Sequence, residues 1–308
     1  MHRLIIILGP TASGKSSLAI KLAKKFKGEI ISADSRQVYR GMDIGTGKIS
    51  KKEQRLVPHY LMDVANPKKQ FTVSDFKKLG AQAIERIKKK HKLPFIVGGT
   101  AFYIYSLIDD WQIPEVAPNK KLRNTLRNKS TRELFAMLQK LDPRRAANID
   151  SRNPARLSRA IEIVKTTGRP VPSLSSPTPI GDLNKDSRFR GNDTKVLLLG
   201  IRKDQNELYK LIDKRLEERL RSGMVAEVKK LHKSGLSWNK LESFGLEYRF
   251  VSLYLQNKLS YRKMVDQLKS AIHKFSKRQN TWFKRDTRIH WIKNEKEARK
   301  LIKPYLSS

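Results

Sequence analysis

The chain has 308 residues, with 66 lysines and arginines against 29 aspartates and glutamates, and no cysteine. This length can bury a sizeable core, so we expect one large domain with an insertion or appendage. The lack of cysteine excludes disulfides, thiolate metal sites and a cysteine nucleophile, and no apolar stretch approaches the roughly 20 residues that a membrane span needs. The net charge of +37 favours a polyanionic partner, with nucleic acid ahead of an anionic membrane surface.

A phosphate-binding loop is predicted near the start of the chain. The apolar residues 4–8 predict a buried strand, residues 9–16 read Gly-Pro-Thr-Ala-Ser-Gly-Lys-Ser, and a helical pattern follows. This fits G-x-x-x-x-G-K-[ST], in which backbone N–H groups and the helix N-terminus surround an anion. Lys15 would reach a terminal phosphate, and the Ser16 hydroxyl would bind Mg²⁺. The predicted diphosphate- or nucleotide-binding residues are Gly9, Pro10, Thr11, Ala12, Ser13, Gly14, Lys15 and Ser16.

The two ends of the chain predict one parallel sheet. Residues 1–114 alternate strand and helix patterns, and the expected elements lie at 4–8, 29–32, 76–90 and 95–97. Residues 195–308 rejoin this core through a strand at 196–199 and are otherwise mostly helical.

An insertion is predicted between these two parts. Prolines at 114 and 118 mark a boundary, and residues 115–170 carry only helical patterns rich in arginine and lysine. Residues 171–194 are rich in proline, serine and glycine and predict a flexible loop. The predicted fold class is therefore α/β, a P-loop NTPase-like parallel sheet flanked by helices, with an all-helical insertion domain.

Two polar residues follow predicted strands. Asp34 comes after the strand at 29–32, and Thr100 follows the strand at 95–97. Ligands of open α/β sheets bind beyond the carboxyl ends of the strands, so both residues should face the crevice of the phosphate loop. Asp34 would bind Mg²⁺, act as a general base, or only cap a turn. Thr100 would hydrogen-bond a phosphate or the attacking group, cap the next helix, or do both.

A basic and aromatic segment lies near the end of the chain. Residues 277–283 read Lys-Arg-Gln-Asn-Thr-Trp-Phe. Aromatic rings can stack on unpaired bases while cations hold phosphates, but packing of Trp282 and Phe283 in the core beside an exposed basic face is equally compatible. His59 and His91 have no second histidine nearby, so we expect no zinc site.

Taken together, these segments resemble the tRNA dimethylallyltransferases, also called tRNA isopentenyltransferases. The resemblance rests on the phosphate loop and on the sequences at 31–48, 97–100, 155–162 and 277–283, among which residues 34–48 are highly specific. It implies transfer of a dimethylallyl group from dimethylallyl diphosphate to N6 of adenosine-37, next to the anticodon in tRNA, with release of diphosphate. It also implies Mg²⁺ as cofactor and the tRNA anticodon stem-loop as partner.

The resemblance implies roles for individual residues. Asp34 would take the N6 proton, Thr100 would position the reacting groups, and Lys15 and Arg215 would contact the diphosphate. The target base must leave its stack to enter the crevice, and the basic insertion would grip the anticodon loop. The implied tRNA-binding residues are Asp34, Ser35, Arg36, Gln37, Thr100, Arg123, Arg156, Arg159, Lys277, Arg278, Gln279, Thr281 and Trp282.

Three other functions stay open at this point. An isopentenyltransferase of free adenine nucleotides would not need the basic insertion or the basic C-terminal helix. A small-molecule kinase would transfer a phosphoryl group from ATP, and an NTP-gated RNA-binding protein would modify nothing.

The expected setting of the protein is cytoplasmic. The apolar run at 4–8 is too short for a signal peptide and belongs to the phosphate loop, and we expect a monomer without membrane contact. Arg36 and Ala101 depart from the usual pattern of the family.

Overall fold

The computed structural model describes residues 2–109, 111, 113–172 and 194–307. It divides into two compact units, one formed by Met1–Asp110 with Ile180–Ser308 and the other by Trp111–Pro179. The insertion predicted at 115–170 lies within the second unit. The loop predicted at 171–194 falls outside the described residues except at its two ends.

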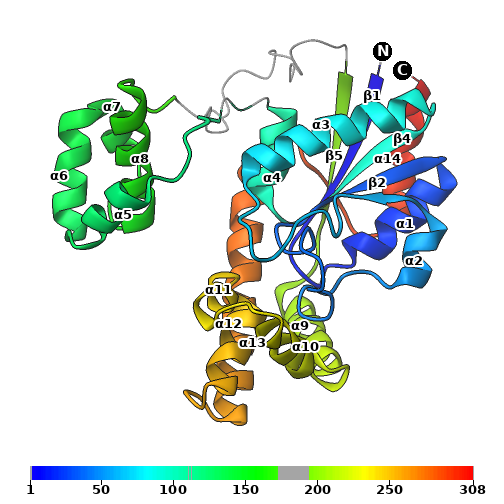
Figure 1. The fold of residues 1–308 in the computed structure, drawn as a ribbon. Coiled ribbons are helices and arrows are strands. Elements are labelled where there is room, and N and C mark those ends of the chain that lie inside the picture. The colour runs from blue at the N-terminus through cyan, green and yellow to red at the C-terminus, as the bar shows by residue number, and fades with distance from the viewer. Residues whose placement is uncertain (1, 110, 112, 173–193, 308) are drawn as a thin grey trace. The chain divides into compact units, whose positions relative to one another are not determined.

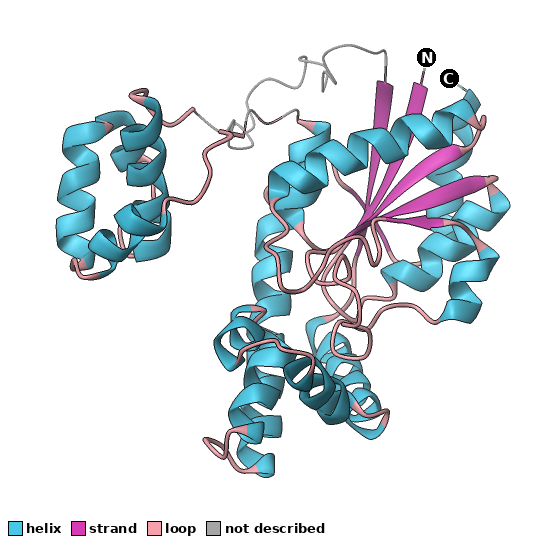
Figure 2. Cartoon of the chain, viewed as in Figure 1, coloured by secondary structure: helices cyan, strands magenta, loops and turns pink. Residues whose placement is uncertain are grey.

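A parallel sheet forms the centre of the first unit (Figures 1 and 2). Its strands lie in the order β3-β2-β4-β1-β5-β6, and every neighbouring pair is parallel. The strands are β1 His2–Leu8, β2 Gly28–Ala33, β3 His59–Tyr60, β4 Leu93–Gly98, β5 Thr194–Ile201 and β6 His290–Ile292. The sequence predicted the four longer strands but not β3 and β6, which are short edge strands with too few residues to show a pattern.

Helices cover the sheet, and the central strand β1 is buried on both faces. Its residues from Leu4 to Leu8 are fully buried, which explains why they read as a continuous apolar run. One core cluster joins β1 and β5 to Leu22 of α1 and Ile302 of α14. The helices of this unit are α1 Lys15–Lys25, α2 Lys51–Leu56, α3 Val73–Lys89, α4 Ala101–Ile108, α9 Gln205–Arg221, α10 Met224–Lys233, α11 Trp238–Ser243, α12 Leu246–Leu255, α13 Tyr261–Phe283 and α14 Glu295–Ser307.

No helix in the described part of either unit combines the length and the apolar character that a membrane span requires.

Strand register brings three strand ends to the same level. Leu8 of β1 pairs with Gly98 of β4, and Gly98 pairs with Ala33 of β2. A Cβ at position 98 would lie 2.1 Å from the Ala33 carbonyl oxygen, so only glycine allows this approach. The segments that follow these three strands therefore leave the sheet side by side.

The long helix α13 changes its surroundings along its length. Met264, Leu268 and Ile272 form a buried stripe. Phe275 continues this stripe, but its ring is only partly buried and lines a cavity. The second half of α13 is therefore a wall of that cavity as well as a core helix.

The second unit is a small helical bundle. Its helices are α5 Lys120–Arg127, α6 Thr131–Leu141, α7 Pro143–Ala147 and α8 Pro154–Thr167. Leu126, Leu134, Leu138, Leu157 and Ile161 are buried together in its core. The bundle therefore has an apolar centre that belongs to it alone.

A buried carboxylate, Glu162, ties α5 to α8 in this bundle. Arg123 donates to both of its oxygens at 2.8 and 2.7 Å, Arg159 donates at 2.6 Å, and the Asn119 N–H donates at 2.7 Å. Burial favours a higher pKa for Glu162, but the hydrogen bonds from Arg123, Arg159 and Asn119 outweigh it and lower the pKa to about 2. The charged form of Glu162 is thus part of the folded bundle.

We predict that Glu162→Gln destabilises the protein by about 2 kcal/mol at pH 7, since it unpairs two arginines that remain partly solvated. Because the folded pKa lies below the ordinary value of 4.5, this contribution is complete above pH 4.5 and is lost as the pH falls toward 2. Chemical denaturation followed by circular dichroism at pH 7 and pH 4 measures it. Glu115→Gln, at an exposed position of the same unit, is the control, and equal stability of the two variants would contradict the prediction.

Candidate active site

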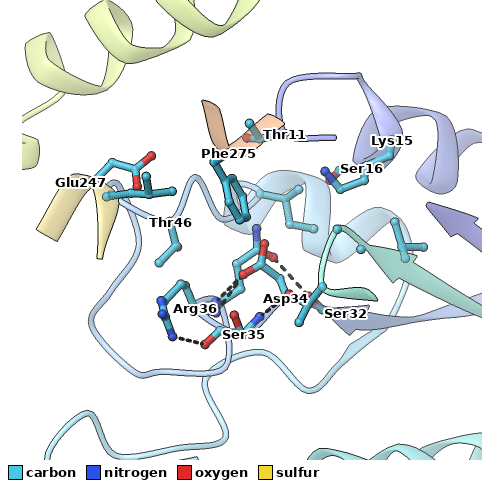
Figure 3. A pocket seen from close by; sticks show the side chains of 18 of the residues that line it. Thr11, Lys15, Ser16, Ser32, Asp34, Ser35, Arg36, Thr46, Glu247 and Phe275 are labelled. Atoms are coloured by element: carbon cyan, nitrogen blue, oxygen red, sulfur yellow. Dashed lines mark hydrogen bonds between the residues drawn. The ribbon is translucent and has the colours of Figure 1, made fainter. Parts of the chain in front are cut away.

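A cavity of about 360 Å³ opens where the carboxyl ends of β1, β2 and β4 meet (Figure 3). Residues of the phosphate loop, the segment after β2, α9, the start of α12 and α13 line it. The lining holds five lysine and arginine side chains and two carboxylates, a formal excess of three positive charges: Lys15, Arg36, Arg215, Arg219 and Arg278 against Asp34 and Glu247. Such a hollow attracts an anionic ligand.

The phosphate loop is tied to its neighbours by a side chain from α13. Gln279 accepts a hydrogen bond from the Thr11 N–H at 2.9 Å and donates one to the Gly99 carbonyl at 2.9 Å. Gln279 is buried, and both ends of its amide are used by backbone groups. Lys15 donates through Nζ to the Pro10 carbonyl at 3.1 Å, folding back over the loop.

Asp34 and Thr100 lie in one hydrogen-bonded turn. Asp34 accepts the N–H groups of Arg36 at 2.8 Å and Gln37 at 3.3 Å through the same oxygen, Oδ1. Thr100 occupies the N-cap position of α4, as the helix-cap alternative predicted, but its side chain makes no capping hydrogen bond and instead accepts the Ser35 N–H at 3.1 Å. The other oxygen of Asp34 and the hydroxyl proton of Thr100 have no protein partner in the described ranges, and both residues line the cavity.

The three residues after Asp34 form part of the cavity wall. Arg36 donates through Nε to the Phe244 carbonyl at 2.6 Å, and its guanidinium carbon lies 5.9 Å from the centre of the Phe244 ring. Gln37 accepts from the Ser32 hydroxyl at 3.2 Å. Ser35, Arg36 and Gln37 all line the cavity, and their contact with tRNA stays a prediction.

Three cations near the phosphate loop repel one another. Burial lowers the pKa of Lys15 to about 8; Asp34 acts in the opposite direction, and Arg215 and Arg219 add to the lowering. Burial, and after it the charge of Arg219, lowers the pKa of Arg215 to about 10. An anion bound among these groups would offset their desolvation and their repulsion.

A carboxylate that the sequence did not single out holds the loop at 43–47. Glu227 of α10 accepts the N–H groups of Asp43, Ile44 and Gly45 at 2.8, 2.7 and 3.0 Å, and the Tyr248 hydroxyl at 2.8 Å. Its three backbone partners lie more than 180 residues away in the sequence. No local pattern could have revealed this contact.

The loop held by Glu227 in turn holds two arginines of α9. Arg215 donates to the Gly47 carbonyl at 3.0 Å, and Arg219 donates to the Gly45 carbonyl at 3.3 Å. Gly47 has φ 60°, and a Cβ there would lie 1.9 Å from Arg219 Nη2, so the guanidinium groups pack directly on the loop backbone. Glu227 therefore positions Arg215 and Arg219 through the loop.

The predicted tRNA-binding residues of the second unit divide into two kinds. Arg123 and Arg159 pair with Glu162, with 39% and 36% of their side chains exposed. Arg156 is exposed. Two of the three arginines thus have a structural role in the bundle in addition to any role toward RNA.

The predicted residues at the end of α13 also differ from one another. Lys277 and Arg278 are exposed, and Arg278 also lines the cavity. Thr281 is exposed and donates to the Lys277 carbonyl at 3.0 Å within the helix. Trp282 packs against Tyr105, with ring centres 4.7 Å apart.

The residues around the phosphate loop suit a magnesium ion held mainly by ligand oxygens. Ser16 lines the cavity beside Lys15, and its hydroxyl has no protein partner in the described ranges. The described residues contain no group of three or more histidine or acidic side chains that could hold a metal. Mg²⁺ commonly takes one or two protein ligands and completes its shell with waters and substrate phosphates, which matches Ser16 and Asp34.

A parallel α/β sheet with a phosphate loop after its central strand, and a basic cavity at the ends of the strands, defines an enzyme of the phosphate-loop class. The family model described as IPP transferase matches residues 37–286. A tRNA dimethylallyltransferase 1 of Syntrophus aciditrophicus (strain SB) is 41% identical, over 96% of this chain and 95% of that protein. Another, from Geotalea uraniireducens (strain Rf4), is 40% identical over 97% of each.

Solved structures agree with these relatives. The crystal structure of the full-length tRNA isopentenylpyrophosphate transferase from Bacillus halodurans matches with a TM-score of 0.71 and 30% identity, over 100% of this chain and 96% of that one. A eukaryotic dimethylallyltransferase acting on tRNA matches with a TM-score of 0.75 and 25% identity, over 95% of this chain and 74% of that one. The chain therefore belongs to the IPP transferase family. The predicted family and fold class are confirmed.

We predict that Glu227→Ala weakens the binding of inorganic diphosphate at least about tenfold, because Arg215 and Arg219 lose the carbonyls that hold them. Isothermal titration calorimetry measures the affinity, and circular dichroism verifies the fold. Glu217→Ala, an exposed position on α9, should bind as the wild type does. Unchanged affinity in a folded Glu227→Ala protein would show that the loop does not depend on this carboxylate.

We also predict that Lys15→Met stabilises the empty protein by about 2 kcal/mol at pH 7, because a desolvated charge is removed. The folded wild type loses the Lys15 proton near pH 8, whereas the unfolded chain loses it near pH 10.5. The free energy of unfolding of the wild type therefore rises between these two pH values, and the stability advantage of Lys15→Met shrinks. Melting temperatures from pH 7 to 10 measure it, with Lys21→Met, exposed on α1, as control. A stability difference between Lys15→Met and the wild type that does not change with pH would refute the lowered pKa of Lys15.

Proposed function

We propose that the chain transfers a dimethylallyl group from dimethylallyl diphosphate to N6 of adenosine-37 in tRNA and releases diphosphate. Membership of the IPP transferase family supports prenyl transfer, and the names of the relatives support tRNA as acceptor. The observation that carries the proposal is the shared cavity of the phosphate loop and Asp34. An anion site and a proton acceptor that face one cavity could act on the same pair of substrates.

Asp34 is the proposed base. Its Oδ1 is occupied by two backbone N–H groups, which fixes the carboxylate and leaves Oδ2 for the N6 amine. As N6 bonds to the first carbon of the prenyl group, its proton passes to Asp34. The bond from that carbon to the diphosphate oxygen breaks, and its electron pair stays on the diphosphate.

The phosphate loop and its cations are the proposed site of the leaving group. Lys15 and Arg215 approach the anion, and the Thr100 hydroxyl, which accepts from Ser35 and keeps its proton, donates to the oxygen that leaves. Mg²⁺ bound through Ser16 would neutralise charge on the diphosphate. The fixed cations favour the transition state because they need no reorientation as charge develops.

The acceptor must be a single flipped base, because the cavity is too small for a duplex. Phe275 and Arg278 lie at the cavity with the guanidinium carbon 5.9 Å from the ring centre, an arrangement that suits base stacking and phosphate contact. Exposed Lys277, and Arg156 of the second unit, are proposed RNA phosphate contacts. A tRNA substrate also favours the predicted cytoplasmic location, and a monomer stays the expectation.

The test is mass spectrometry of nucleosides after incubation of the protein with Mg²⁺, dimethylallyl diphosphate and unmodified tRNA. The wild type should add one five-carbon prenyl unit to adenosine. Asp34→Asn should lower the rate at least about 100-fold, because the amide keeps the turn but cannot take a proton.

The matched control is Asp266→Asn, at an exposed position on α13, which should react as the wild type does. Binding of tRNA and of inorganic diphosphate by Asp34→Asn should stay near the wild-type values. Full activity of Asp34→Asn would remove Asp34 as the base. Wild-type protein that binds tRNA and yields no prenylated adenosine would refute the proposed reaction for that tRNA.

A further inference from the structure

Arg219 is one of four arginines that line the cavity, and the family resemblance gives it no role. It lies one helical turn after Arg215 on α9, so the two side chains share a face, and both line the cavity. Its side chain is only 12% exposed and pairs with Glu247, which is 14% exposed, at 2.9 Å. A nearly buried ion pair thus forms part of the wall of a ligand site.

This ion pair leaves part of the Arg219 fork unused. Nη1 donates both to Glu247 and to the Gly45 carbonyl. Nε is buried and has no hydrogen-bond partner in the part of the chain that the structure describes. A buried donor without a partner is costly. Because Arg219 also lines the cavity, a bound ligand can supply the acceptors that the protein does not give its guanidinium.

The local charge indicates the chemistry of that acceptor. Lys15, Arg215 and Arg219 lie close enough for each arginine to lower the pKa of Lys15. Glu247 balances one of these charges, although burial raises its own pKa; the charge of Arg219, a backbone hydrogen bond and the charge of Arg215 act in the opposite direction. The planar guanidinium fork matches two oxygens of a phosphate group better than it matches neutral acceptors.

We propose that Arg219 is a second diphosphate-binding arginine of this site, and that Glu247 is the counter-ion that orients it. The identity of the diphosphate as the prenyl donor rests on the proposed function; the binding of a diphosphate does not. Arg219 donates hydrogen bonds and transfers no proton. Its contribution grows as the carbon–oxygen bond breaks and the electron pair stays on the diphosphate.

The competing explanation is a purely structural clasp between α9 and α12. Removing Arg219 alone leaves Glu247 buried and unpaired, which destabilises a protein whatever the role of the arginine. Replacing both partners with apolar side chains removes that penalty. A double variant therefore separates a structural role from a binding role.

The experiment compares wild type, Arg219→Met, the double variant Arg219→Met with Glu247→Met, and Arg219→Lys. Arg221→Met, exposed on the same helix, is the matched control. For each protein, thermal melting gives stability and calorimetry gives the affinity for inorganic diphosphate in Mg²⁺ buffer. Prenylation assays give KM for dimethylallyl diphosphate and kcat.

We expect Arg219→Met to lose stability and to bind diphosphate at least about tenfold more weakly. The double variant should regain stability but keep the weak binding and the raised KM. Arg219→Lys keeps the ion pair without the fork, so it should be stable and bind diphosphate more weakly than wild type. Arg221→Met should match the wild type throughout.

Recovery of diphosphate affinity in the double variant, or wild-type affinity in Arg219→Lys, would overturn the proposal. The ion pair would then have only a structural role between α9 and α12. If the double variant stays unstable, the diphosphate affinity of Arg219→Lys alone decides between the binding role and the structural role. Wild-type protein that binds diphosphate through Arg219 but prenylates no tRNA would refute the proposed reaction while the diphosphate site stands.

Discussion

The close approach of β2 and β4 at Gly98 is the constraint on which the site depends. The absence of a Cβ at residue 98 allows β4 to lie against the Ala33 carbonyl, and the register of these pairs puts the ends of β2, β4 and β1 at one level. The phosphate loop, Asp34 and Thr100 each begin within two residues of that level. A base and an anion site can then face the same small volume without any long side chain having to reach across it.

The charged groups form a chain of support around this volume. Glu227 fixes the loop at 43–47 through three backbone N–H groups, and the carbonyls of that loop hold Arg215 and Arg219. The protein thus keeps several desolvated cations close together before any ligand arrives. This costs stability in the empty state, and a bound anion reverses the cost, which is the usual compromise at a site organised in advance for charge.

The sequence allowed the phosphate loop, the longer strands and the position of Asp34 to be predicted, because each depends on neighbours within a few residues. It could not reveal Glu227 or the pairing of Arg219 with Glu247, since these contacts join distant segments and leave no periodic signal. Nor could it reveal that the buried amide of Gln279 joins two backbone segments, because burial is a property of the tertiary fold. The RNA contact that the resemblance implies for Gln279 stays a prediction.

Gln279 also connects α13 directly to the phosphate loop through its hydrogen bonds. The same helix presents two other residues to the cavity: Phe275, one turn before Gln279, and Arg278, directly before it. A nucleic acid that shifts or rigidifies this helix therefore acts on the loop through a single side chain. By thermodynamic reciprocity, an anion that orders the loop changes the affinity of the helix for nucleic acid by the same factor. The two proposed ligands of this cavity would then be energetically coupled, although the groups proposed to contact them belong to different segments.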